Sequence, residues 1–170
     1  TADLAAAANA ESQVYLVPAF TGLGSPHWDS EARGAIFGLT RDTGPAEIAR
    51  ATLEAVCYQT RDLFLAMAHD GTKPPNVIRV DGGFAGNDWA MQFLADILGL
   101  IVERAEVEET TALGAAMLAG MRAGVSPGLD GLSVRWRCKQ RFTPKMTNHV
   151  RDEKYTGWLN AVERTLTRTA

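Results

Sequence analysis

The sequence predicts an α/β fold in which some strands run parallel. Short apolar runs alternate along the chain with longer segments of helical periodicity. Glycine and proline stand at most of the boundaries between these segments. The 170 residues are 46% hydrophobic and 22% charged, which is typical of a globular domain with its own core. Alternation of this kind favours a sheet with helices packed on its faces.

The N-terminal part of the chain is predicted to hold a helix, two strands and a long loop. Residues 1–10 are rich in alanine, which favours a helix. Residues 14–17 form a short apolar run that a proline ends, as is typical of a buried strand. Glycine and proline interrupt residues 20–33 and predict a loop. Residues 34–40 are predicted to form a second strand, which glycines interrupt.

A long helix is predicted to begin at Gly44-Pro45 and to end near Asp70-Gly71. Proline suits the first turn of a helix, and the two prolines at 74–75 prevent its continuation. On this helix Arg50 and Glu54 lie one turn apart, so we expect them to pair on the surface. Its apolar positions roughly follow helical spacing; they are Ile48, Thr52, Ala55, Val56, Leu63 and Met67.

The second half of the chain begins with a strand, a helix and another strand. Residues 77–80 are predicted to form the first strand. Asn87 or Asp88 can cap the helix that follows, and Gly99 is a natural stop for it. Residues 101–104 are predicted to form the next strand.

Two further helices are predicted near the C-terminal end. Thr110 or Thr111 can cap a helix of small residues over 112–123. Residues 151–167 have the apolar spacing of an amphipathic helix. Residues 131–139 are not assigned to a helix or a strand.

Asp81-Gly82-Gly83, which we call the glycine turn, is the main candidate for a functional site. It lies between a predicted strand and a helix that begins near Asn87. Such an arrangement directs backbone N–H groups and a helix N-terminus at one point, which favours bound phosphate. Glycine also lets a ligand approach the backbone closely. The alternative is an ordinary strand–helix turn capped by Asn87. Neither GxxxxGK[ST] nor GxGxxG occurs in the sequence.

Two other segments could line a ligand site. Residues 22–26, Gly-Leu-Gly-Ser-Pro, could border a cleft or form an ordinary surface loop. We expect Phe20, His27 and Trp28 beside them to be packing residues. Residues 111–116, Thr-Ala-Leu-Gly-Ala-Ala, favour close packing of a helix on a sheet. The alternative is a helix whose first turn lies beside a nucleotide.

Composition argues against several classes of function. The net charge of −3 implies no basic face for nucleic acid or an anionic membrane. No apolar run approaches the roughly 18 residues of a membrane span. Cys57 and Cys138 form no CxxC pair, so we expect reduced thiols in a cytosolic protein. The histidines lack metal-ligand spacing, and no metal site is predicted. The first residue is Thr1 and no signal peptide follows it, so we expect processing or a longer parent protein.

Several segments together resemble the C-terminal domain of the FGGY carbohydrate kinases, and most closely their glycerol kinase branch. Residues 14–40 read VYLVPAFTGLGSPHWDSEARGAIFGLT. A spaced pattern is similar to the second signature of the family. It consists of Gly34-x-Ile36-x-Gly38-Leu39, then seven residues, then Glu47-Ile48-x-x-Ala51-Thr52-Leu53-Glu54. RVDGGFAGND at 79–88, TALGAAMLAG at 111–120 and YTGW at 155–158 agree in order and spacing. The resemblance covers about residues 14–165.

The resemblance implies a ribonuclease-H-like domain of the actin/hexokinase/Hsp70 superfamily that is partial and lacks its early strands. In that superfamily ATP lies in the cleft between two such domains. The implied enzyme is a transferase that moves the γ-phosphoryl of ATP, bound with Mg²⁺, to glycerol and gives sn-glycerol 3-phosphate. Gly83 and Asn87 correspond to the family positions that contact the ADP part of the nucleotide.

The resemblance also implies that the catalytic base and the glycerol ligands lie outside these residues, in the N-terminal half of the same enzyme. We therefore expect no catalytic residue here and no activity from residues 1–170 alone. A cytoplasmic homo-oligomer is expected, and the missing strands should leave open sheet edges. Val150 stands where some bacterial members carry a glutamate that helps bind a sugar-transport regulator through zinc, so no such regulation is expected.

Residues 1–170 are predicted to form one kinase domain fragment, with an α/β nucleotide-binding core over 14–125 and a C-terminal extension over 126–170. Two alternatives stay open at this point. One is another FGGY kinase that acts on a pentulose or a polyol. The other is a non-catalytic nucleotide-binding or interaction module.

Overall fold

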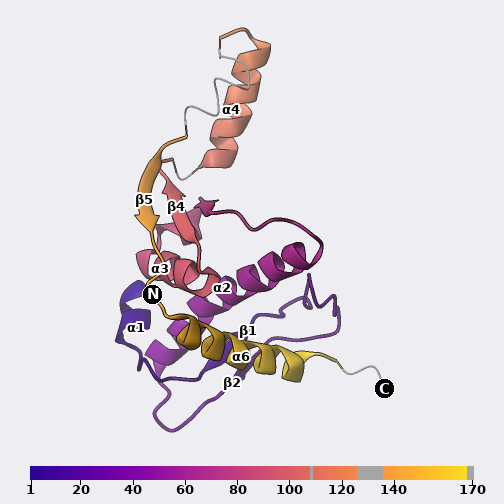
Figure 1. Cartoon of the computed structure of the whole chain (residues 1–170), viewed down its shortest axis with the longest axis vertical. Coiled ribbons are helices and arrows are strands. Elements are labelled where there is room, and N and C mark those ends of the chain that lie inside the picture. Colours follow the sequence, from indigo (N-terminus) through magenta and orange to yellow (C-terminus); the bar gives the residue numbers. More distant parts are fainter. Residues whose placement is uncertain (108, 126–135, 168–170) are drawn as a thin grey trace.

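Helix α2 (Pro45–His69) lies at the centre of the molecule, and the other helices and the strands are arranged around it (Figure 1). The computed structural model describes residues 1–107, 109–125 and 136–167. The backbone N–H of Gly44 donates to Glu47 Oε2 at 2.8 Å, which closes the first turn of α2. The helix ends before Asp70, so both predicted boundaries are confirmed.

One small sheet lies on the N-terminal side of α2. Strand β1 (Tyr15–Val17) pairs antiparallel with β2 (Ala35–Phe37), with Leu16 opposite Ile36. Both predicted strands are confirmed. Helix α1 (Ala2–Ala7) packs against α2 and confirms the helix predicted in residues 1–10.

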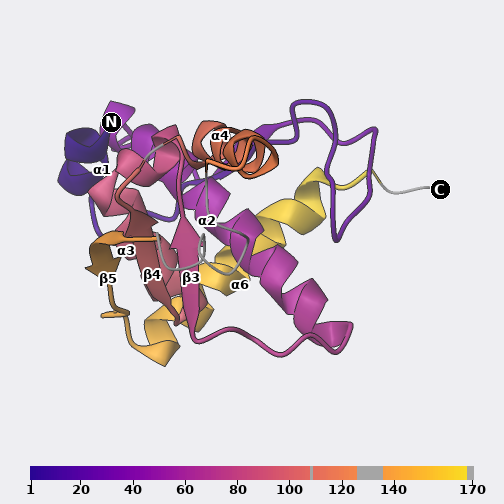
Figure 2. The same cartoon turned by 90° about the horizontal axis from the view of Figure 1, so that it is seen from above.

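A second sheet has the strand order β3-β4-β5 (Figure 2). Strand β3 (Val77–Val80) runs parallel to β4 (Ile101–Ala105), and helix α3 (Asp88–Leu98) connects them. Strand β5 (Cys138–Phe142) pairs antiparallel with β4. The α/β class with parallel pairing is therefore confirmed. Among the described residues no strand pairs with the outer edge of β3, so this sheet has the open edge that was expected.

Strand β5 was not predicted, because residues 131–139 were not assigned to an element and the strand itself, Cys-Lys-Gln-Arg-Phe, has three polar residues in succession. The residues of β5 are mostly exposed and only Phe142 is buried. Residues 131–135 of that stretch lie outside the described part of the chain. The predicted division at 125/126 adjoins the same gap and stays a prediction.

The core joins α2, α3 and helix α6 (Asn148–Thr165) through aromatic side chains. Trp158 and Tyr58 are each 1% exposed, and their rings stack with centroids 5.3 Å apart. Phe93 meets the Tyr58 ring edge-on at 5.5 Å. The Asp62 carboxylate is buried among them and accepts hydrogen bonds from Tyr155 Oη at 2.5 Å and Trp158 Nε1 at 2.8 Å. These donors offset the cost of burying the carboxylate.

The buried face of α2 is not the face that carries the predicted apolar spacing. Ile48, Val56 and Met67 remain 39%, 42% and 41% exposed. Arg50 and Glu54 pair as predicted, with Arg50 Nε donating to Glu54 Oε1 at 2.7 Å. The expected surface location of this pair is wrong, because Glu54 is buried and also accepts from Tyr58. Polar residues can occupy the buried face because hydrogen-bond donors satisfy them, from α2 itself for Glu54 and from α6 for Asp62. The buried positions are Ala51, Leu53, Glu54, Ala55, Cys57, Tyr58 and Asp62.

Helix α4 (Thr110–Arg122) extends away from the rest of the molecule (Figure 1). None of its described residues is buried, so the close helix–sheet packing expected for residues 111–116 is wrong. A Cβ atom at Gly114 would meet no heavy atom within 4 Å. In the described part of the chain, no helix combines the length and the hydrophobicity that crossing a membrane requires.

Candidate functional site

The glycine turn follows β3 directly and leaves its backbone open. Gly82 has φ 82° and ψ 175°, a conformation that strongly favours glycine. Gly83 then begins a short 3₁₀ helix, η1 (Gly83–Gly86). A Cβ atom added at Gly83 would meet nothing within 4 Å. An external group can therefore approach this backbone without a side chain in its way.

Asn87 caps helix α3, and this confirms the prediction that it can cap the helix after the glycine turn. Its Oδ1 accepts a hydrogen bond from the backbone N–H of Ala90 at 3.1 Å. No hydrogen bond joins its Nδ2 to another described residue, and the side chain is half-buried. Capping uses the oxygen and leaves the amide N–H groups for a ligand, so the cap and a ligand contact are compatible.

The start of α4 lies beside the glycine turn. Thr110 Oγ1 donates a hydrogen bond to Asp81 Oδ2, which joins the first turn of α4 to the end of β3. Glu109, at the N-cap position, makes no side-chain capping bond. The alternative interpretation of residues 111–116 was a helix whose first turn lies beside a nucleotide. The first turn of α4 lies beside the glycine turn, which is the candidate nucleotide site.

A buried arginine supports the segment that follows the turn. Arg104 on β4 is 7% exposed and donates from Nη1 to Ala85 O at 2.9 Å and to Asp88 Oδ1 at 2.7 Å. Its Nη2 donates to Gln140 Oε1 on β5. The Arg104 guanidinium beside Asp88 holds the pKa of that carboxyl below its usual range, and a hydrogen bond from Gln140 acts in the same direction. Sequence reasoning missed Arg104, because nothing in a strand pattern distinguishes a buried arginine from an exposed one.

Three carboxyls have pKa values that the folded state lowers. Asp88 owes this to Arg104, Asp29 to hydrogen bonds from Thr167, and Glu47 to backbone N–H groups. A lowered folded pKa adds stability above the unfolded pKa, and that stability is lost as the pH falls through the folded value. We expect the urea midpoint to be nearly constant between about pH 7 and 5 and to fall below about pH 4. The Asp88→Asn variant should show a shallower fall; a midpoint that rises on acidification below that range would contradict the assignment.

The other glycine-rich segment, residues 22–26, closes on its own loop. Leu23 and Asp29 exchange two backbone hydrogen bonds, of 2.7 and 3.0 Å. A Cβ atom at Gly22 would lie 2.7 Å from Asp29 O, so this glycine serves the turn itself. Phe20 and Trp28 are 79% and 78% exposed, so the expectation that they pack inside is wrong.

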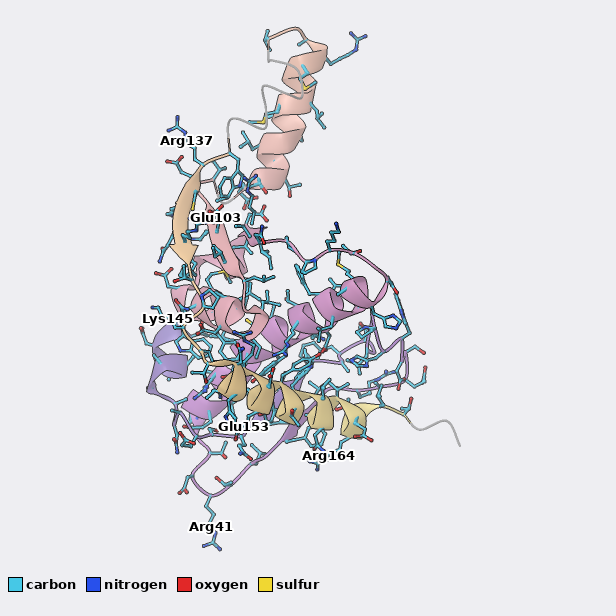
Figure 3. The ribbon with its side chains drawn as sticks, in the orientation of Figure 1. Arg41, Glu103, Arg137, Lys145, Glu153 and Arg164 are labelled. Carbon is cyan, nitrogen blue, oxygen red and sulfur yellow. The ribbon has the colours of Figure 1, made fainter. Side chains whose placement is uncertain are left out.

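A separate cleft lies between β1, β2 and α6. It has a volume of about 780 Å³, and no residue of the glycine turn or of η1 lines it. Glu153 and Arg164 project from α6 (Figure 3), and the Arg164 guanidinium lies 4.3 Å from the centre of the Phe37 ring at the cleft wall. Tyr15 also lines it, and burial raises the pKa of that phenol to about 12. The lining of the cleft mixes charged side chains such as Asp42 and Glu47 with apolar ones such as Phe37 and Leu39.

Comparison with known proteins assigns the family. Residues 1–123 match the model for the C-terminal domain of the FGGY family of carbohydrate kinases. The chain belongs to the FGGY family of carbohydrate kinases. Among curated relatives of this family, the glycerol kinase of Ectopseudomonas mendocina is 59% identical over 161 residues, which are 95% of this chain and 32% of that protein. The chain spans about a third of the length of the curated relatives it matches.

Solved structures of FGGY kinases share the fold. The glycerol kinase of Plasmodium falciparum with ADP superposes with a TM-score of 0.84 at 36% identity, over 98% of this chain and 33% of that one. A ligand-bound xylulose kinase from Lactobacillus acidophilus superposes with a TM-score of 0.78 at 25% identity, over 95% of this chain and 33% of that one. The predicted membership of the actin/hexokinase class of folds is thereby confirmed, as is the resemblance to FGGY kinases.

Proposed function

We propose that this chain forms the nucleotide-holding C-terminal part of an ATP-dependent glycerol kinase. The observation that carries the proposal is the open backbone at Gly83, set between the end of β3 and the start of α3. The 59% identity to a glycerol kinase and the open backbone at Gly83 together support a role in holding ADP and ATP. The whole enzyme would transfer the γ-phosphoryl of ATP, bound with Mg²⁺, to the terminal hydroxyl of glycerol.

In this proposal Gly83 and Asn87 hold the nucleotide and take no part in the chemical step. The Gly83 backbone allows close approach, and Asn87 Nδ2 donates to an oxygen of the ADP part. Phosphoryl transfer depends mostly on positioning and on neutralising charge. The catalytic base, the Mg²⁺-linked groups and the glycerol ligands belong to the N-terminal half of the enzyme. Closure of the two halves excludes water and favours transfer over hydrolysis.

Glycerol is favoured over another sugar or polyol by the contrast in identity. The glycerol kinase from Plasmodium is 36% identical to this chain, whereas the xylulose kinase is 25% identical at a similar coverage. The resemblance further supports a cytoplasmic, homo-oligomeric enzyme in which residues 1–170 alone do not phosphorylate glycerol.

Titration of the ¹⁵N-labelled chain with ADP tests the nucleotide role of the glycine turn. We expect the chemical shifts of the Gly83 and Asn87 amides to change with increasing ADP. The affinity should be weak, because many of the contacts that enclose the nucleotide belong to the N-terminal half of the enzyme. Gly83→Val places a branched side chain on the approach path and should weaken binding by about tenfold or more, or about 1.4 kcal/mol.

Gly24→Val is the matched control for this titration. A Cβ atom added at Gly24 would also meet no heavy atom within 4 Å, but Gly24 lies in the loop over 20–33. This variant should bind ADP as the wild type does. Unchanged ADP affinity in a folded Gly83→Val variant would count against the proposed role of Gly83.

A further inference from the structure

We propose that Arg104 is a positioning residue of the nucleotide site, an inference that rests on the proposed function of the glycine turn. Arg104 does not reach the open side of the turn itself. Its partners in this segment are the Ala85 carbonyl of η1 and the Asp88 carboxylate at the start of α3, two and five residues after Gly83. It therefore acts on the nucleotide through the segment that would hold it.

The first effect of Arg104 is to fix the orientation of η1. Two of the four residues of η1 are glycines, which by themselves allow the backbone wide conformational freedom. Arg104 Nη1 binds Ala85 O at 2.9 Å, and the Ala85 side chain is buried. Because a peptide unit is planar, fixing this carbonyl also fixes the direction of the Gly86 N–H. A turn that is already ordered loses less entropy when a ligand binds.

The second effect is to neutralise an acidic group at the start of α3. A carboxylate in the first turn of a helix competes with a phosphate for the positive end of the helix. Both oxygens of Asp88 are engaged, Oδ1 by Arg104 at 2.7 Å and Oδ2 by Gln140 Nε2 at 3.3 Å. The three side chains thus link β4, β5 and α3 and keep the Asp88 charge paired.

Stability alone does not account for this arrangement. The Asp88 side chain is 62% exposed, and an ion pair with an exposed partner contributes little net stability. The Arg104 Nε is buried and has no hydrogen-bond partner among the described residues, which adds a cost. The Arg104 guanidinium carbon lies 5.7 Å from the centre of the Phe142 ring, so an apolar methionine side chain has an apolar neighbour there.

The test compares Arg104→Met with Arg104→Lys and a matched control in the ADP titration. We expect Arg104→Met to keep its unfolding midpoint close to that of the wild type and to bind ADP about tenfold more weakly. Its Phe84 and Gly86 amides should also exchange with solvent faster before ADP is added. Lysine keeps the charge beside Asp88 but lacks the planar guanidinium with its several N–H donors. The ADP affinity of Arg104→Lys should therefore lie between those of the wild type and Arg104→Met.

Arg141→Met is the control, because Arg141 lies on β5, is 53% exposed and pairs with Glu103 at 3.5 Å on the surface. This variant should bind ADP as the wild type does. Wild-type ADP affinity in a folded Arg104→Met variant would overturn the role of Arg104. If the methionine variant does not fold, the lysine variant decides in the same way. A wild-type chain whose Gly83 and Asn87 amides ignore ADP would overturn the proposed function, and the role of Arg104 with it.

Discussion

Replacement of Trp158 by alanine is expected to lower the free energy of unfolding by about 3–5 kcal/mol. The indole is buried at the meeting point of α6, α2 and α3, and it stacks on Tyr58. Its Nε1 and the Tyr155 hydroxyl are the two side-chain donors that bind Asp62. Alanine therefore leaves a cavity and also leaves a buried carboxylate with one fewer donor, which adds to the loss.

Urea unfolding followed by circular dichroism measures this change, and Trp28→Ala is its matched control. Trp28 is 78% exposed, so the same deletion there should alter stability by no more than about 0.5 kcal/mol. Trp158→Phe keeps an aromatic ring but removes the N–H, and its loss should be intermediate. Equal losses in Trp158→Ala and Trp28→Ala would contradict this packing of the indole.

Replacement of Gly38 by alanine is expected to lower the free energy of unfolding by more than about 2 kcal/mol. Gly38 has φ 80°, in the left-handed region that favours glycine. An added Cβ would overlap the carbonyl oxygen of Gln13 and lie 2.9 Å from its carbonyl carbon. Because both are backbone atoms, the connection after β2 must move away from the chain before β1.

Gly71→Ala isolates the backbone part of this cost. Gly71 has φ 88°, but an added Cβ there would meet nothing within 4 Å. Its loss should be about 1–2 kcal/mol, the cost of the left-handed conformation alone. Thermal unfolding of the two variants gives the difference. Similar losses in both would show that the close approach to Gln13 has no energetic consequence.

Gly38 also gives a physical reason for one part of the family pattern. It is the second glycine of the segment Gly34-x-Ile36-x-Gly38-Leu39, which resembled the signature of the FGGY kinases. The structure shows that this position brings two backbone segments together. Its glycine therefore maintains the fold of the β1–β2 sheet.

Local signals in the sequence predicted the elements well where the signal acts within one turn. Proline at the first position and glycine after the last turn placed α2 correctly. Asn87 was predicted as a cap, and it caps α3. Gly99, in the left-handed conformation, ends that helix. Caps and breakers act on neighbouring backbone groups, so their effect is present in a short window of sequence.

Predictions that depended on distant neighbours were less successful. The apolar stripe with Ile48, Val56, Leu63 and Met67 remains exposed on α2 in the described structure. The buried face instead includes Glu54 and Asp62, whose partners make their burial possible. Periodicity of apolar residues reports which faces are hydrophobic, and it does not report which partners are present.

In the candidate site too, residues with a local signal could be predicted and residues that depend on distant segments could not. The glycine turn and Asn87 could be selected from the sequence because glycine and a capping asparagine have local meaning. Arg104 could not, because Ala85 and Gln140 lie 19 and 36 residues away from it in the chain. These segments lie together in the folded structure because β4 pairs with both β3 and β5.

The sequence by itself determined the α/β class, the ends of the main helices, the glycine turn and the resemblance to FGGY kinases. These features depend on residues a few positions apart, or on motifs kept in order along the chain. Only the tertiary structure decided which face of α2 is buried, that no described residue of α4 is buried, and that Arg104 supports η1. Burial and ion pairing depend on the solvent and charge around each group, and distant segments create that environment.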